Sequence, residues 1–160
     1  MKLTSNKKKM YLSVIHSILL EQSMMPITFE LLQNDASITQ VMVKETTHFV
    51  YAKYASKPSS RRVHQKRWSF KFHYDEILKI EKYYQLNSNF HIFFHLSDED
   101  YQSEICALTY DEFKRCIGDD TINKDRRIAF ISKPRHRTRV YGTKIADTDA
   151  FIVTNSLFNA

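Results

Sequence analysis

Residues 68–74 alternate strictly between aromatic and polar side chains, and the aromatic ones all fall on one side. A period of two residues is typical of a β-strand with one buried face. The preceding residues 57–67 contain a proline, two serines and five Lys or Arg without any acidic residue. We therefore expect a half-buried strand that the chain enters through a cationic loop.

A second alternating segment, residues 90–96, reads Phe-His-Ile-Phe-Phe-His-Leu. Between the two segments, Asp75 and Glu76 precede a run with apolar residues at helical spacing, which ends near residues 87–89. Acidic side chains in a first turn stabilise a helix by interacting with its dipole. The pattern predicts a strand, a helix and a second strand in succession.

The same reasoning assigns the rest of the chain. Thr109 and Glu112 have the spacing of a capping box, which predicts a helix that stops at Gly118. Apolar residues at helical spacing predict helices over residues 8–24 and, after Pro26, over 27–33. Further strands are expected at residues 38–45, 47–55, 102–108, 127–132, 138–145 and 150–154.

The chain has 160 residues, of which 42% are hydrophobic, and only 2 glycines and 3 prolines. That length and composition predict one domain over residues 1–160 with a packed core. Strands outnumber helices, so we expect an α+β fold with a mixed, mainly antiparallel sheet and helices packed on one face. The expected core includes Val14, Ile18, Phe70, Phe72, Ile92, Phe94, Leu108 and Phe113.

The formal net charge of +6 favours an anionic partner, either nucleic acid or an acidic protein. The two cysteines, Cys106 and Cys116, form no C-x-x-C pair and indicate reduced, structural thiols. The basic start of the chain is followed by no small-residue cleavage site, and no run of about 18 apolar residues exists. We expect a cytoplasmic protein without a membrane segment.

Two cationic loops, residues 57–67 and 133–139, give the sequence its strongest functional signal. Long basic side chains on loops that join strands suit contacts with phosphate groups, and neighbouring aromatic rings such as Tyr54 and Tyr141 suit stacking on bases. The opposite interpretation is two solvated loops with Trp68 in the core. The candidate nucleic-acid-binding residues are Arg61, Arg62, Lys66, Arg67, Trp68, Lys133, Arg135, Arg137 and Arg139.

Histidines at positions 73, 91 and 95 suggest a metal site only at first sight. His91 and His95 would share a face on a helix, but four residues along a strand span about 13 Å, too far for one ion. We expect these histidines on the less buried face of the sheet, and we assign no metal or cofactor.

The acidic run around Asp98 and Asp100, with Glu104 after it, is a candidate Mg²⁺ site for phosphodiester cleavage. The Asp…Glu-x-Lys pattern of one nuclease class is absent, because Thr47 follows Glu45 at the lysine position and Cys106 follows Glu104. A solvated turn is the simpler interpretation.

No nucleophile elbow, glycine-rich phosphate loop or known nucleic-acid-binding motif occurs in the sequence. We therefore assign no catalytic residues. Three hypotheses remain: non-catalytic binding of nucleic acid through the two loops, a module that binds an acidic protein, and a divergent metal-dependent nuclease.

Overall fold

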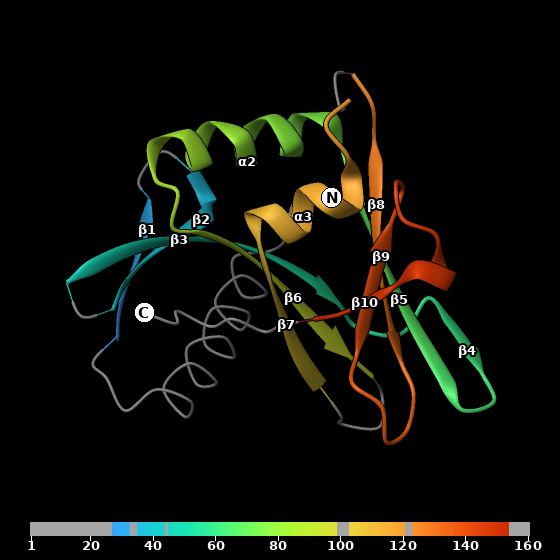
Figure 1. Cartoon of the computed structure of the whole chain (residues 1–160). Helices are drawn as coiled ribbons and strands as arrows, with labels where there is room; N and C mark the ends of the chain where they lie inside the picture. The colour runs from blue at the N-terminus through green and yellow to red at the C-terminus, as the bar shows by residue number, and fades with distance from the viewer. Residues whose placement is uncertain (1–26, 33–34, 44, 99–102, 121–122, 154–160) are drawn as a thin grey trace.

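The computed structural model describes residues 27–32, 35–43, 45–98, 103–120 and 123–153. Within these ranges the chain forms ten strands in two five-stranded sheets, together with the helices α2 and α3 (Figure 1). The helix expected over residues 8–24 and the core residues Val14 and Ile18 lie outside the described residues.

The first sheet has the strand order β1-β2-β3-β6-β7. Its strands are Ile27–Leu32 (β1), Asp35–Val43 (β2), Thr46–Ala55 (β3), Phe90–Ser97 (β6) and Ser103–Thr109 (β7). Neighbours pair antiparallel except β3 and β6, which run parallel. The sheet is therefore mixed, as the sequence predicts.

The second sheet has the order β10-β9-β8-β5-β4 and is antiparallel throughout. Its strands are Ser60–Arg62 (β4), Gln65–Phe72 (β5), Arg126–Ser132 (β8), Arg139–Gly142 (β9) and Phe151–Ile152 (β10). A short 3₁₀ turn, Asp147–Asp149, precedes β10. Helix α2 (Tyr74–Leu86) joins β5 to β6, and α3 (Tyr110–Ile117) joins β7 to β8, so each helix carries the chain from one sheet to the other.

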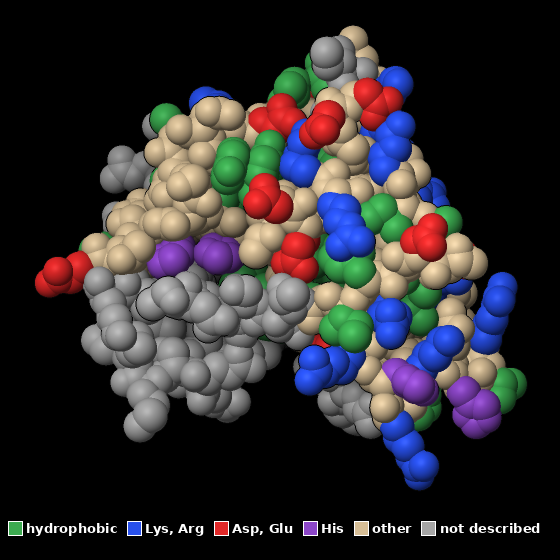
Figure 2. All heavy atoms as spheres, viewed as in Figure 1, with side chains coloured by type: hydrophobic (Ala, Val, Ile, Leu, Met, Phe, Trp, Pro, Cys, Tyr) green, Lys and Arg blue, Asp and Glu red, His purple; other side chains and the backbone are tan. Residues whose placement is uncertain are grey.

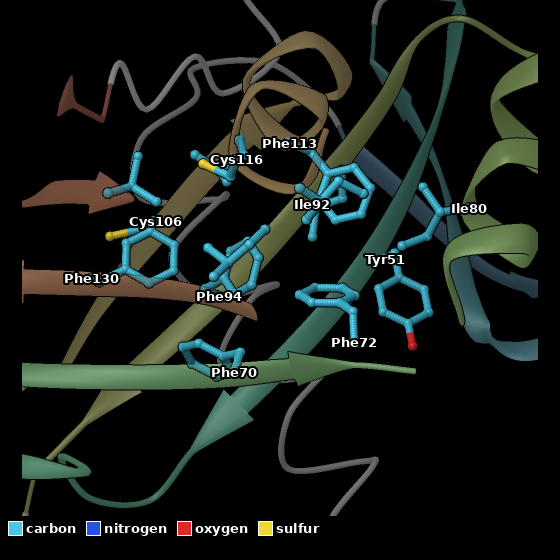
Figure 3. Close-up of a cluster of buried hydrophobic side chains, with 14 of the residues drawn as sticks. Tyr51, Phe70, Phe72, Ile80, Ile92, Phe94, Cys106, Phe113, Cys116 and Phe130 are labelled. Atoms are coloured by element: carbon cyan, nitrogen blue, oxygen red, sulfur yellow. The ribbon is translucent and has the colours of Figure 1, made fainter. Parts of the chain in front are cut away.

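Aromatic side chains fill the space between the two sheets (Figure 3). The ring of Phe70 on β5 lies 5.0 Å from that of Phe94 on β6, and Phe94 lies 4.8 Å from Phe130 on β8. Phe72 contacts Phe113 of α3 at 5.2 Å, so the helices join the same core. All six core residues expected within the described chain are buried: Phe70, Phe72, Ile92, Phe94, Leu108 and Phe113.

Two expectations differ from the structure. Residues 27–32 form strand β1 rather than a short helix, because a neighbouring strand, β2, supplies backbone hydrogen-bond partners that helical spacing over so few residues does not reveal. The strands also divide between two sheets. The apolar faces of segments 68–74 and 90–96 pack on each other, which requires them to lie in opposite sheets.

The capping box at the start of α3 is confirmed. Thr109 Oγ1 accepts a hydrogen bond from the backbone N–H of Glu112, and Glu112 accepts one from the N–H of Thr109. The helix ends at Gly118, whose φ of 81° suits glycine. No helix among the described residues is long and apolar enough to cross a membrane.

Candidate functional site

The two cationic loops of the sequence meet at one end of the second sheet. Strands β5 and β8 run antiparallel with Lys66 opposite Ser132, so the start of β5 and the end of β8 lie side by side. The β4–β5 hairpin and the loop from Lys133 to Thr138 are therefore neighbours, although about seventy residues separate them in sequence. Figure 1 shows the β4–β5 turn and the β8–β9 loop at the same end of the molecule.

The end of strand β6 in the first sheet reaches the same place. The indole Nε1 of Trp68 on β5 donates a hydrogen bond to the carbonyl oxygen of Ser97, at 2.9 Å. Asp98 follows Ser97, and Glu104 lies on β7 opposite Leu96. Carboxylates from one sheet thus meet basic side chains from the other.

A groove of about 790 Å³ lies at this junction. Its buried or half-buried floor and its exposed rim differ in chemistry. The floor is formed by Trp68, Leu96, Asp98 and Glu104, and the sides and rim by Arg62, His64, Gln65, Lys66, Ser132, Lys133 and Pro134. Figure 2 shows Lys, Arg and His side chains gathered over this part of the surface.

Asp98 is the most buried charged group of the groove, with only 1% of its side chain exposed. Its carboxylate accepts hydrogen bonds from both terminal nitrogens of Arg61, at 2.5 and 3.3 Å, and pairs with Lys66 Nζ at 2.6 Å. A buried carboxylate needs such partners to offset its lost hydration. These pairs tie the β4–β5 hairpin to the end of β6.

Glu104 is held from another direction. The hydroxyl of Thr138, which is buried immediately before β9, lies 2.8 and 2.9 Å from the two carboxylate oxygens of Glu104. Cys106 Sγ is a weaker donor to Glu104 at 3.7 Å, and burial followed by the nearby Glu104 charge raises the pKa of this thiol. Because the Thr138 hydroxyl lies within hydrogen-bond distance of both oxygens, it occupies the face on which the carboxylate could otherwise accept two parallel hydrogen bonds.

The nine candidate nucleic-acid-binding residues separate into three groups. Arg62, Lys66, Trp68 and Lys133 line the groove, and Arg61 joins them through Asp98. Arg135 and Arg137 are exposed in the β8–β9 loop beyond the lining. Arg67 and Arg139 lie elsewhere.

Arg67 alternates with the inward-facing Lys66 and Trp68, so it projects from the other face of its sheet. There its guanidinium lies 5.5 Å from the ring of Tyr141 and 3.7 Å from Asp147. Arg139 donates to the carbonyl oxygen of Ala150 at 3.2 Å. Both residues are engaged in contacts within the second sheet and its β10 edge.

Trp68 is not placed for stacking on an incoming base at the surface. Only 5% of the residue is exposed, and its polar nitrogen is already bonded to Ser97. The core interpretation of this tryptophan is therefore correct, although one side of it contributes to the groove floor. Tyr54 and Tyr141 do not line the groove.

Two of the three histidines lie on a strand, as expected, but not on an open face, whereas His73 lies at the N-cap of α2. His91 and His95 are on β6, and His95 is buried, with 8% exposed, as is the adjacent Phe93. His48 Nδ1 lies 3.2 Å from His91 Nε2 across β3 and β6. Burial, with a further contribution from His48, lowers the pKa of His91 to about 4.

His73 is exposed, and its Nδ1 lies 3.5 Å from Asp125 Oδ2. In the part of the chain that the structure describes, no three His, Cys, Asp or Glu side chains group as metal ligands would. Of the carboxylates considered for Mg²⁺, Asp98 and Glu104 do share the groove, whereas Asp100 lies outside the described residues. Both cysteines are buried and free, and burial also raises the pKa of Cys116, to about 12.

Sequence reasoning treated the acidic and basic residues of this groove as separate features. No spacing links Glu104 to Thr138 or Asp98 to Arg61, because each pair joins two different sheets. Only the pairing of β5 with β8 and the packing of the sheets bring them together. Comparisons with protein-family models, with curated proteins and with solved structures found no match to this chain.

Proposed function

We propose that this protein binds nucleic acid through the groove, with the basic rim contacting phosphate groups. The observation that carries the proposal is the convergence of both cationic segments: Arg62 and Lys66 from the β4–β5 hairpin and Lys133 from the β8–β9 loop line one groove. Arg135 and Arg137 extend the basic surface beyond it. Phosphate contacts of this kind supply most of the affinity in sequence-independent binding.

The dimensions and shape of the site also support this proposal. A groove of about 790 Å³ lies within the range of small-ligand sites and is open along a rim of long, flexible side chains. Lysine and arginine side chains at such a rim can follow a phosphate backbone that passes over it. The two free, buried thiols suit the cytoplasmic setting that we also propose.

An acidic protein would engage the same rim charges, and the test has to separate it from nucleic acid. The extent of the basic surface favours nucleic acid, because Arg135 and Arg137 continue the cationic rim beyond the groove, as contacts with successive phosphate groups require. We place nucleic acid first for this reason.

The test is binding of a labelled single-stranded oligonucleotide, followed by fluorescence anisotropy over a series of salt concentrations. The double variant Arg62→Ala, Lys133→Ala removes one rim cation from each segment. Each phosphate contact in a single strand contributes about 0.7 to the slope of log K against log salt, so the slope should become shallower by about 1.4.

The matched control is Lys82→Ala, Arg127→Ala, which removes the same net charge from α2 and from the far end of β8. Both side chains are exposed and neither lines the groove. If both double variants lose the same affinity, binding depends on net charge alone, and the groove is not the binding site. No binding of any oligonucleotide at low salt would refute the function itself.

A further inference from the structure

We propose, resting on the nucleic-acid binding proposed above, that Val63 and Pro134 pack against unstacked bases of a bound single strand while the basic residues beside them contact its phosphate groups. Val63 lies at the tip of the β4–β5 hairpin, and Pro134 lies in the β8–β9 loop. The feature that carries this inference is a local arrangement that both tips share: a cation, then an exposed apolar residue, then a residue with positive φ.

The first tip is the turn of the β4–β5 hairpin. Arg62 of β4 pairs with Gln65 of β5, so only Val63 and His64 lie between the two strands. His64 has a φ of 65°. Val63 is 85% exposed, the highest value among the large hydrophobic residues that the structure describes. Because a β-branched side chain on a short turn has few conformations, it loses little entropy when a ligand covers it.

The second tip repeats this arrangement in the β8–β9 loop. The backbone N–H of His136 donates a hydrogen bond to the carbonyl oxygen of Lys133 at 3.1 Å, which closes a turn around Pro134 and Arg135. Arg135 has a φ of 65°, the same value as His64 in the first turn. Pro134 is exposed and lines the groove, and its ring restricts its own backbone. Each loop thus presents one rigid apolar side chain.

A basic residue lies on each side of both apolar tips. These neighbours are Arg62 and His64 around Val63, and Lys133 and Arg135 around Pro134. Figure 2 shows hydrophobic side chains among the basic ones over this part of the surface. A single strand has the complementary pattern, because its charged phosphates alternate with bases that each present an apolar face.

Only a strand with unstacked bases can make both kinds of contact. In a duplex the faces of the bases are covered by neighbouring base pairs, so a duplex reaches the cations alone. Trp68 is the only phenylalanine, tyrosine or tryptophan in the groove lining, and it is buried. The two exposed tips are therefore the apolar surface on which a base can pack, and such packing tolerates any base.

A membrane surface suits these tips less well. One small apolar side chain on each turn would bury little hydrocarbon in a lipid layer, and stable attachment to a membrane takes more than one weak signal. A base, in contrast, is small enough for one side chain to cover part of its face. We therefore commit to single-stranded nucleic acid as the partner.

The experiment compares two labelled single strands of equal length and charge: oligothymidine, and an abasic oligomer with the same sugar–phosphate backbone. Their affinities for the whole chain are measured by fluorescence anisotropy. Both strands can contact the cations, but only oligothymidine has bases to cover the apolar tips. We expect oligothymidine to bind about tenfold more tightly, as burial of a few apolar groups gives.

The double variant Val63→Ser, Pro134→Ser removes both apolar side chains without changing the charge. It should weaken oligothymidine binding about fivefold and leave the affinity of the abasic strand unchanged. The slope of log K against log salt should also stay the same, because apolar contacts release no counterions. The matched control is Leu78→Ser, Leu86→Ser, which changes two exposed hydrophobic residues of α2 outside the groove lining and should alter neither affinity.

The two proposals fail in different ways. If the abasic strand binds as tightly as oligothymidine and Arg62→Ala, Lys133→Ala weakens both, nucleic-acid binding stands and the base contact is refuted. A serine variant that binds oligothymidine as tightly as the original protein refutes the role of the two tips. If neither strand binds, both proposals fail.

Vesicles of phosphatidylcholine and phosphatidylserine test the other kind of partner by cosedimentation. We expect the serine variant and the original protein to sediment with them equally. If the serine variant loses vesicle binding but keeps its affinity for oligothymidine, the tips contact lipid, and the inference is overturned.

Discussion

The guanidinium of Arg61 donates to both carboxylate oxygens of Asp98, at 2.5 and 3.3 Å, and so links the edge strand of one sheet to the end of a central strand in the other. Arg61 is partly exposed, whereas Asp98 is almost wholly buried. The two-bond geometry fixes the hairpin against the body of the protein. Lys66 completes the arrangement at 2.6 Å from the same carboxylate.

Asp98→Asn should lower the free energy of unfolding. The change removes the negative charge that offsets Arg61 and Lys66 but keeps the size of the side chain. Because both cations are partly exposed and can return to water, the loss should be modest, about 1–2 kcal/mol. Chemical denaturation followed by circular dichroism measures it.

Asp149→Asn serves as the control, since the side chain of Asp149 is exposed in the short turn before β10. It should leave the unfolding midpoint almost unchanged. An Asp98 variant as stable as the original protein would show that the hairpin does not depend on this contact.

The regular elements were largely predictable because each depends on neighbours in sequence. The capping box at Thr109 and the alternation of residues 90–96 both involve residues within one segment, and both are confirmed. The identity of β1 and the division into two sheets depend on pairing between distant segments, and both were missed. Periodicity identifies a buried face but does not identify what covers it.

The candidate groove was predictable only in part, because some of its residues are neighbours in sequence and others are not. The basic residues stand together in two runs, so the sequence shows them, whereas the contact of Thr138 with Glu104 depends on packing of β9 near β7. The hydrogen bond from Trp68 to Ser97 likewise joins residues of the two sheets. Residues that a fold brings together from two sheets leave no spacing to detect.

Gly142→Ala should destabilise the protein strongly. A Cβ at this position would lie 2.6 Å from the carbonyl oxygen of Cys116 and 2.7 Å from that of Arg127. Both are backbone atoms that cannot move away from an added methyl group, because the end of α3 and strand β8 meet there. We expect a loss of about 2 kcal/mol or more, measured by chemical denaturation. A fully stable variant would mean that these segments are not in close contact.

Trp68 is the single tryptophan, so intrinsic fluorescence reports on the groove floor. With 5% of the residue exposed, its emission should be blue-shifted and protected from acrylamide, and should shift to the red on unfolding. The phenylalanine variant removes the hydrogen bond to Ser97 and should cost about 1–2 kcal/mol. Emission typical of exposed tryptophan in the native protein would contradict this packing.

Stability should fall in mild acid because of His91. Burial lowers the pKa of this imidazole to about 4 in the folded protein, against 6.5 for an ordinary histidine. Between these two values the unfolded chain binds a proton that the native state does not, so stability is constant above about pH 6.5 and falls as the pH approaches 4. From pH 7.5 to pH 5 the loss should be on the order of 2 kcal/mol.

The variant His91→Gln separates this effect from general acid denaturation. Glutamine cannot take up a proton, so the decline in melting temperature between pH 7.5 and pH 5 should become smaller. Part of the decline should remain, because burial also lowers the pKa of His48. His136→Gln, a change in the exposed β8–β9 loop, should retain the full decline. If the His91 variant and the original protein had the same pH profile, His91 would take up its proton equally well in the native and unfolded states.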